Sequence, residues 1–166
     1  MTGFPALRTR RLTLRPVVPE DAEAMVAVLA DPLLYTFTGG SPPDLDQLRD
    51  RYRRLAGGRS PDGAERWLNW IVRLDEVPIG VVQATVRPAA GEADVAWEIG
   101  TAWQGRGYAS EAAAGLVDWL LADGVRVVGA YVHPEHVASQ RVAARAGLSR
   151  TEATVDGEQR WVRTAS

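Results

Sequence analysis

The sequence predicts one α/β domain, residues 1–166, built on a mixed but mostly antiparallel sheet. Apolar residues at every second position indicate strands, and apolar residues at every third or fourth position indicate helices. Residues 94–132 read as strand, helix and strand in direct succession, an order that usually gives parallel strands with a right-handed crossover. Short turns separate the other strands and favour antiparallel pairs. We expect about seven strands and about four helices.

The first expected elements are a strand and a helix. Residues Arg11–Arg15 alternate between polar and apolar, which indicates a strand. Pro19 fits the first turn of a helix that ends before Pro32. The core-facing side of this helix would consist of apolar residues at helical spacing: Ala22, Met25, Val26 and Leu29.

A second helix is expected to start at Pro42-Pro43 and to end at Gly57-Gly58. Its buried residues would be Leu45, Leu48, Tyr52 and Leu55. Two strands, Trp67–Leu74 and Ile79–Arg87, then follow around a turn at Asp75-Glu76.

The second half continues with a strand at Asp94–Ile99 and a long amphipathic helix that Gly124 ends. The apolar stripe of this helix has nearly ideal periodicity: Ala109, Ala112, Ala113, Leu116, Val117, Leu120 and Leu121. The remaining expected elements are a strand at Val125–Val132, a helix at about Ala138–Ala146 that ends at Gly147, and a hairpin of Leu148–Val155 and Glu158–Val162 around Asp156-Gly157.

The composition excludes several kinds of chemistry. The chain has no Cys, and every basic side chain other than histidine is Arg, so thiolate nucleophiles, disulfides and Lys Schiff bases are ruled out. A net charge of −2 argues against nucleic acid as a partner. No apolar run approaches the roughly 20 residues of a membrane helix, and Met1–Arg11 lacks the layout of a signal peptide. We therefore expect a cytoplasmic protein without a membrane partner.

The junction between the Asp94–Ile99 strand and the following helix predicts an anion site. It carries Gln104-Gly105-Arg106-Gly107-Tyr108-Ala109, whose small residues leave main-chain N–H groups accessible. The helix adds its own unpaired donors and the positive end of its dipole, which favours a phosphate or pyrophosphate. The segment does not fit the dinucleotide-binding fingerprint, because the third glycine is missing. It also does not fit a P-loop, because the chain has no Gly-Lys-Ser/Thr sequence.

Several side chains near this junction carry acid–base chemistry. Asp94 and Glu98 share one face of their strand and are candidates for a general base, although either also fits a surface ion pair. His133 and His136 are the only histidines, and Pro134 between them disfavours the aligned geometry of a metal site, so we expect no metal. His136 also fits the start of a helix, with its ring on the surface.

Longer stretches of the chain resemble the GNAT acetyltransferase superfamily, and among its branches the Rim-type ribosomal-protein N-terminal acetyltransferases. The junction matches the (Gln/Arg)-x-x-Gly-x-(Gly/Ala) signature of that superfamily. The other matching segments are Leu7–Pro16 with Asp21-Ala22 and Asp31-Pro32, Pro78-Ile79-Gly80, Trp97-Glu98-Ile99-Gly100, Trp103–Ala112, and Ser139-Gln140-Arg141-Val142 with Ala146-Gly147-Leu148.

The resemblance implies that acetyl-CoA is the co-substrate and lies between the Asp94–Ile99 and Val125–Val132 strands, which are parallel but splayed in this family. It implies that main chain around Trp97–Ile99 pairs with the pantetheine arm and polarises the thioester carbonyl. The full set of implied cofactor contacts is Trp97, Ile99, Gln104, Gly105, Arg106, Gly107, Tyr108, Ala109, Ser110, His136 and Ser139.

The resemblance also suggests the catalytic residues. In this family a Glu on the strand of Glu98 often removes the proton of the amine, and the Ser that corresponds to Ser139 assists the departing thiolate. Ser139 also fits a helix cap. Family members usually carry Asn where this chain has His136, so His136 departs from the pattern, and its imidazole is a third candidate for the catalytic set.

The expected reaction is acetyl transfer to a primary amine, by direct attack in a ternary complex. The acceptor is either a protein N-terminus or a small amine, and Tyr35 and Phe37 lie in the loop through which this superfamily admits it. Two alternatives stay open: a non-catalytic acyl-CoA-binding or sensing domain, and a nucleotide-phosphate binder. The C-terminal hairpin has an edge that can pair with a second subunit, and a homodimer is therefore expected.

Overall fold

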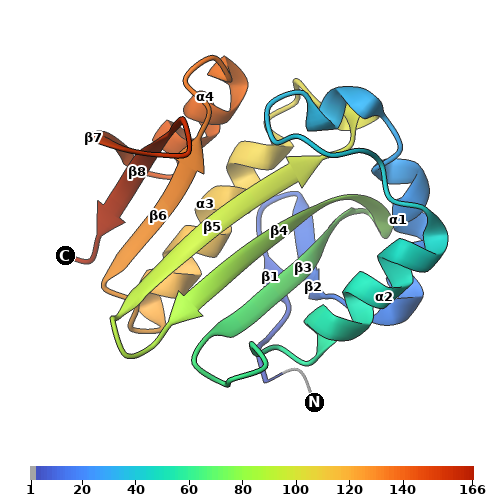
Figure 1. Ribbon diagram of the computed structural model, residues 1–166, viewed down its shortest axis with the longest axis horizontal. Coiled ribbons are helices and arrows are strands. Elements are labelled where there is room, and N and C mark those ends of the chain that lie inside the picture. The colour runs from blue at the N-terminus through green and yellow to red at the C-terminus, as the bar shows by residue number, and fades with distance from the viewer. Residues whose placement is uncertain (1–2) are drawn as a thin grey trace.

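Eight strands form one sheet in the order β1-β2-β3-β4-β5-β6-β8-β7 in the computed structural model, which describes residues 3–166 (Figure 1). All neighbouring strands pair antiparallel except β5 and β6. The strands are β1 (Leu7–Arg8), β2 (Leu12–Pro16), β3 (Arg66–Leu74), β4 (Val77–Arg87), β5 (Glu92–Ile99), β6 (Val127–Val132), β7 (Ser149–Val155) and β8 (Glu158–Thr164). The predicted mixed α/β class is confirmed; the additional strand is the two-residue β1, which is too short to leave a periodic pattern.

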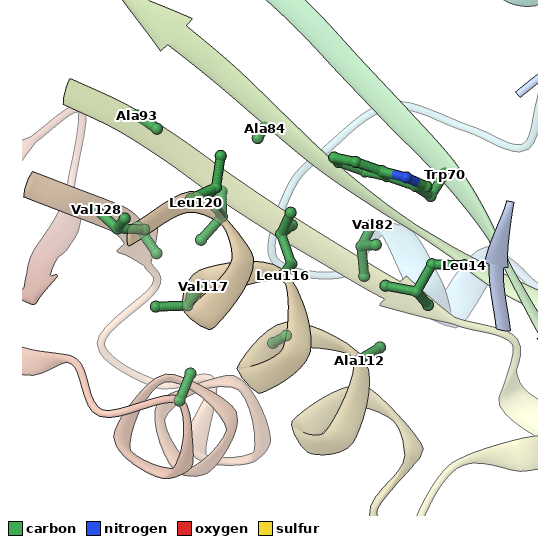
Figure 2. Packing of buried hydrophobic residues seen from close by; sticks show 14 of the residues in the cluster. Leu14, Trp70, Val82, Ala84, Ala93, Ala112, Leu116, Val117, Leu120 and Val128 are labelled. Carbon is green, nitrogen blue, oxygen red and sulfur yellow. The ribbon is translucent and has the colours of Figure 1, made fainter. Parts of the chain in front are cut away.

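Helices cover both faces of the sheet. They are α1 (Ala22–Val28), α2 (Leu45–Ala56), α3 (Tyr108–Ala122) and α4 (Val137–Arg145), with short 3-10 turns η1 (Pro19–Asp21), η2 (Pro32–Tyr35) and η3 (Thr101–Trp103). One face packs against α3, whose buried Leu116 and Leu120 lie against Val82 and Val128 of the sheet (Figure 2). The other face packs against α1 and α2 through a smaller cluster that includes Met25. None of the helices in residues 3–166 has the length and apolar character needed to cross a bilayer.

The parallel pair β5–β6 separates after a short contact. Only Glu92–Asp94 pair with Val127–Gly129, and from Val95 onward β5 has no partner strand on this side within the described chain. The two strands diverge toward their C-terminal ends in Figure 1. The free half of β5 therefore presents unpaired main-chain groups beside a gap in the sheet.

Two sequence predictions need correction. Helix α2 begins at Leu45 and not at Pro42-Pro43, because the Asp44 side chain accepts from the N–H of Gln47 while the Gln47 side chain accepts from the N–H of Asp44. This capping box fixes the first turn after the prolines. Tyr35, which was expected in a loop, lies instead in the 3-10 turn η2.

The two predicted tight turns are present. Asp75 and Glu76 have φ of 48° and 71°, and Asp156 and Gly157 have φ of 51° and 80°. Positive φ at both central residues is the signature of the turn type that suits the twist of a hairpin. The C-terminal hairpin inserts β8 next to β6, which leaves β7 at the edge of the sheet.

Candidate active site

The turn between η3 and α3 forms a cradle of main-chain donors. Gly105 and Gly107 have φ of +80° and +82°, a conformation that side chains disfavour. The N–H of Glu111 donates to Gly107 O at 3.0 Å and begins the helical pattern. Within residues 3–166, none of the N–H groups from Gly105 to Ser110 donates a hydrogen bond to protein. Together with the positive end of the α3 dipole, these donors form an anion site.

Gln104 fixes this cradle to the end of β5. Its Nε2 donates to Ile99 O at 2.9 Å, and its N–H donates to Thr101 O at 3.3 Å. The Gln104 donors are therefore engaged within the protein, in contrast to those of the following residues. The Gly80 main chain lies so close to β5 that an added Cβ would be 2.2 Å from Glu98 O, so only glycine permits this approach.

Arg11 supports the cradle from the other side. Its Nη1 donates to Arg106 O at 3.1 Å, and its guanidinium lies 4.5 Å from the centre of the Tyr108 ring. Its Nε also pairs with Glu111 at 2.7 Å. Burial alone would raise the pKa of the Glu111 carboxyl, but hydrogen bonds from Thr9 and Arg11 outweigh it and lower that pKa below its usual value. Arg11 has no sequence signal for this role, because 100 residues separate it from Glu111.

Trp97 and Ser139 face each other across the gap beside β5. The indole Nε1 of Trp97 donates to Ser139 Oγ at 3.3 Å. Because Oγ accepts this bond, the Ser139 hydroxyl proton is available for donation to another group. Ser139 is not the cap of α4, since the N-cap residue is His136.

His136 caps α4 with its imidazole. Its Nδ1 accepts from the N–H of Ser139 at 3.4 Å, so the neutral ring carries its proton on Nε2. Burial, together with the charge of nearby His133, lowers the pKa of His136 and favours the neutral form. Phe37 stacks on the His136 ring, with the ring centroids 4.4 Å apart. The centroid of the Phe37 ring also lies 5.1 Å from that of the His133 ring. The loop before α2 is thereby held against the segment between β6 and α4.

Of the two acidic residues of β5 that were considered as a base, only Glu98 is free. Asp94 pairs with Arg160 at 2.9 Å and with Arg87 at 3.1 Å. Glu98 makes no ion pair within residues 3–166. Burial raises the pKa of the Glu98 carboxyl, and the positive charge of Arg51 partly opposes this effect. A carboxyl group with a raised pKa is suited to accept a proton near neutral pH.

Three residues from the α1–α2 region, Tyr35, Arg51 and Tyr52, interact electrostatically with Glu98. The hydroxyl of Tyr35 donates to Leu29 O at 3.0 Å, and the Tyr52 hydroxyl is buried without a protein partner in the described chain. Burial raises the pKa of both phenols, and Arg51 opposes this at each. Tyr52 was expected only as a core residue, and Arg51 was not expected at the site, because their proximity to Glu98 depends on how α2 packs.

One further predicted site residue lies within the cradle. Arg106 is exposed, and its carbonyl is held by Arg11. Residues 3–166 contain no group of three or more His, Asp or Glu side chains that could hold a metal ion.

Comparisons with known proteins agree with this geometry. Residues 11–149 match the family described as Acetyltransferase (GNAT) domain. An uncharacterised N-acetyltransferase, p20, of Bacillus licheniformis is 29% identical over 136 residues, which cover 80% of this chain and 76% of p20.

Two solved structures share the fold. RimL, a ribosomal L7/L12 alpha-N-protein acetyltransferase in complex with coenzyme A, superposes with a TM-score of 0.81 at 14% identity, over 97% of this chain and 98% of RimL. The aminoglycoside acetyltransferase AAC(6')-Ib with coenzyme A has a TM-score of 0.75 at 21% identity, over 92% and 94% of the two chains. The match of residues 11–149 shows that the chain belongs to the GNAT acetyltransferase domain family and is an acyltransferase.

Proposed function

We propose that this protein transfers an acetyl group from acetyl-CoA to a primary amine by direct attack within a ternary complex. The observation that carries the proposal is the run of unpaired N–H groups from Gly105 to Ser110, at the end of a strand whose other edge is free. A diphosphate fits such a cradle because main-chain donors and a helix N-terminus favour negative charge. RimL and AAC(6')-Ib, which share the fold, are both described with coenzyme A.

The proposed cofactor contacts follow the shape of the gap. Gly105, Arg106, Gly107, Tyr108, Ala109 and Ser110 hold the diphosphate, and Gln104 keeps their turn against β5. Main chain of Trp97 and Ile99 on the free half of β5 pairs with the pantetheine arm, and one of its N–H groups polarises the thioester carbonyl. The Nε2–H of His136 supplies a donor where the family usually supplies an amide.

Acetyl-CoA supplies the acyl group as a thioester, whose carbonyl carbon is attacked by the nitrogen lone pair of the amine while the C–S bond breaks. Glu98 accepts the proton that the amine nitrogen loses, directly or through one water. Ser139 donates its hydroxyl proton to the sulfur that departs with the bonding electron pair, and it regains a proton from solvent. Holding both reactants in one site supplies the proximity that a bimolecular reaction in water lacks.

The acceptor side is formed by the segment before α2. Phe37 and Tyr35 border it, together with Tyr52 and Glu98. RimL is described as acting on a ribosomal protein and AAC(6')-Ib as acting on aminoglycosides, so the fold itself does not define the acceptor.

The proposal is tested by acetyl transfer to a panel of amines, followed as release of free thiol. We expect turnover with at least one amine, and no acetylated enzyme when acceptor is omitted. Trapping of an acetylated enzyme would contradict direct attack. Tight coenzyme A binding without turnover on any amine would favour the non-catalytic acyl-CoA-binding alternative.

A further inference from the structure

A groove of about 380 Å³ lies between α2 and the segment that leads into it. Its lining residues are Ser41, Pro43, Gln47, Asp50, Arg51 and Arg54. The four α2 residues among them lie on one side of the helix, beside the stripe that buries Leu48 and Tyr52. This volume is in the range of pockets that bind small molecules.

Two of the arginines that line the groove form no ion pair within the described residues. Arg51 and Arg54 have no ion pair or side-chain hydrogen bond within residues 3–166. Asp50, which also lines the groove, is paired with Arg53 at 2.9 Å. The α2 side therefore presents two free guanidinium groups, which are well suited to bind a carboxylate or phosphonate through paired hydrogen bonds.

Arg51, which lines the groove, also acts on Glu98 of β5. Arg51 is the positive charge that acts on the Glu98 carboxyl, and it acts in the same way on Tyr35 and Tyr52. A molecule that reaches from Arg51 to Glu98 thus meets a cation at one end and a carboxyl group at the other. This arrangement matches an acceptor with an acidic group at one end and an amine at the other.

Building on the proposed function, we propose that Arg51 and Arg54 form an anion subsite, and that the acceptor is a small amine with a carboxylate or phosphonate, of the amino-acid class. The acidic group binds the two guanidinium groups, and the amine lies beside Glu98. A polycationic acceptor of the aminoglycoside kind is disfavoured because the free arginines repel it.

The experiment compares acceptors that differ only in the acidic group. The panel consists of L-amino acids and ω-amino acids of increasing length, each beside the amine that lacks its carboxylate, together with aminoalkylphosphonates and a short acidic peptide. The kcat/KM for each acceptor is measured with wild-type protein, Arg51→Gln and Arg54→Gln. The matched control is Arg49→Gln, because Arg49 lies on the same helix, is paired with Glu23 at 2.7 Å and does not line the groove.

We expect the wild type to prefer the acid-bearing member of a pair. Arg51→Gln and Arg54→Gln should each lower kcat/KM for that member roughly tenfold or more relative to the plain amine of the same pair, since each removes a charge-assisted hydrogen bond. Comparing carboxylates with phosphonates identifies the acidic group. Equal losses for both members of a pair, a wild type indifferent to the acidic group, or a preference for the peptide would overturn the inference.

Coenzyme A affinity separates this inference from the proposed function. It should be equal in all four proteins, because neither arginine lies at the cradle. If no amine of the panel is acetylated, the proposed function fails, and the subsite is then decided by calorimetric binding of the amino acids to the protein with coenzyme A. Binding that Arg51→Gln abolishes supports the subsite, and absence of binding to the wild type contradicts it.

Discussion

The indole of Trp97 and the hydroxyl of Ser139 connect the free half of β5 to α4, with Nε1 3.3 Å from Oγ. This bond orients the hydroxyl so that its own proton points away from Trp97. A group that supplies a proton to a departing sulfur needs this freedom.

Replacing Ser139 by Ala should slow the chemical step. We expect kcat to fall about 10- to 100-fold, in the lower range of the effects of general acids, while KM for acetyl-CoA changes little. Trp97→Phe removes only the orienting donor and should lower kcat a few-fold. Steady-state kinetics with a saturating amine measures both, and a Ser139→Ala protein with unchanged kcat contradicts the assignment.

Replacing Glu98 by Gln should lower activity and raise stability. Burial raises the pKa of its carboxyl, so the neutral form is favoured in the folded protein more than in the unfolded chain. That stability is fully present below the unfolded pKa and is lost as pH rises through the folded pKa. Glu98→Gln should therefore unfold at a higher temperature than the wild type at neutral pH, and should have a kcat about 100-fold lower.

Thermal unfolding and the pH dependence of kcat/KM check the Glu98 prediction. In the wild type, kcat/KM should rise as pH increases through the pKa of Glu98, and the Gln variant should lack this rise. Glu152→Gln, at an exposed position of β7, is the control and should change neither quantity. Full activity in Glu98→Gln would assign the base elsewhere.

His136 should act as a neutral donor and not as a base. Its Nδ1 accepts from Ser139 N, which places the proton of the neutral ring on Nε2. His136→Asn keeps both a capping oxygen and a side-chain donor, so we expect near-normal activity; His136→Ala should lose about 1 kcal/mol of stability with the cap. Nitrogen NMR shifts of the imidazole identify the tautomer, and a proton on Nδ1 is the contrary result.

Arg160 and Asp94 should maintain the point at which β5 and β6 separate. The Arg160 side chain passes Gly129 to pair with Asp94. A Cβ added at Gly129 would lie 2.5 Å from Nη2 of Arg160. Arg160→Met should cost about 1 kcal/mol of stability and should raise KM for acetyl-CoA several-fold. Arg53→Met removes an exposed pair and is the control. Chemical denaturation and steady-state kinetics provide the two readouts, and an unchanged KM rejects a link between this pair and the gap.

The sequence was most informative where the signal is local. Leu116, Val117 and Leu120 are buried as their spacing predicts, because a helix brings such positions to one face. The cradle was also predictable, since Gly105 and Gly107 mark positive φ without reference to the rest of the chain. The start of α2 had a local signal too, but the prolines were given more weight than the pairing of Asp44 with Gln47.

Features that depend on tertiary packing could not be predicted from the sequence. Arg11 acts on Glu111 only because the β1–β2 turn lies beside the start of α3. Phe37 meets His136 across the ends of two elements that are about 100 residues apart in the chain. Charge and periodicity carry no information about such distant pairs, and the same is true of Arg51 and Glu98.

The central claim is that the cradle at Gly107 holds the diphosphate of coenzyme A, and calorimetry of Gly107→Val tests it most directly. A side chain at φ +82° is strained, and its Cβ would lie 3.3 Å from Nη2 of Arg11, the residue that holds the cradle. Gly124→Val is the matched control, because Gly124 has φ of +101° at the other end of α3.

We predict that Gly107→Val loses about 100-fold or more in affinity for coenzyme A, since several charge-assisted bonds are lost. Its affinity for pantetheine, which lacks the diphosphate, should not change, and Gly124→Val should bind coenzyme A normally. Unchanged coenzyme A affinity in a folded Gly107→Val protein, or an equal loss for pantetheine, would contradict the claim.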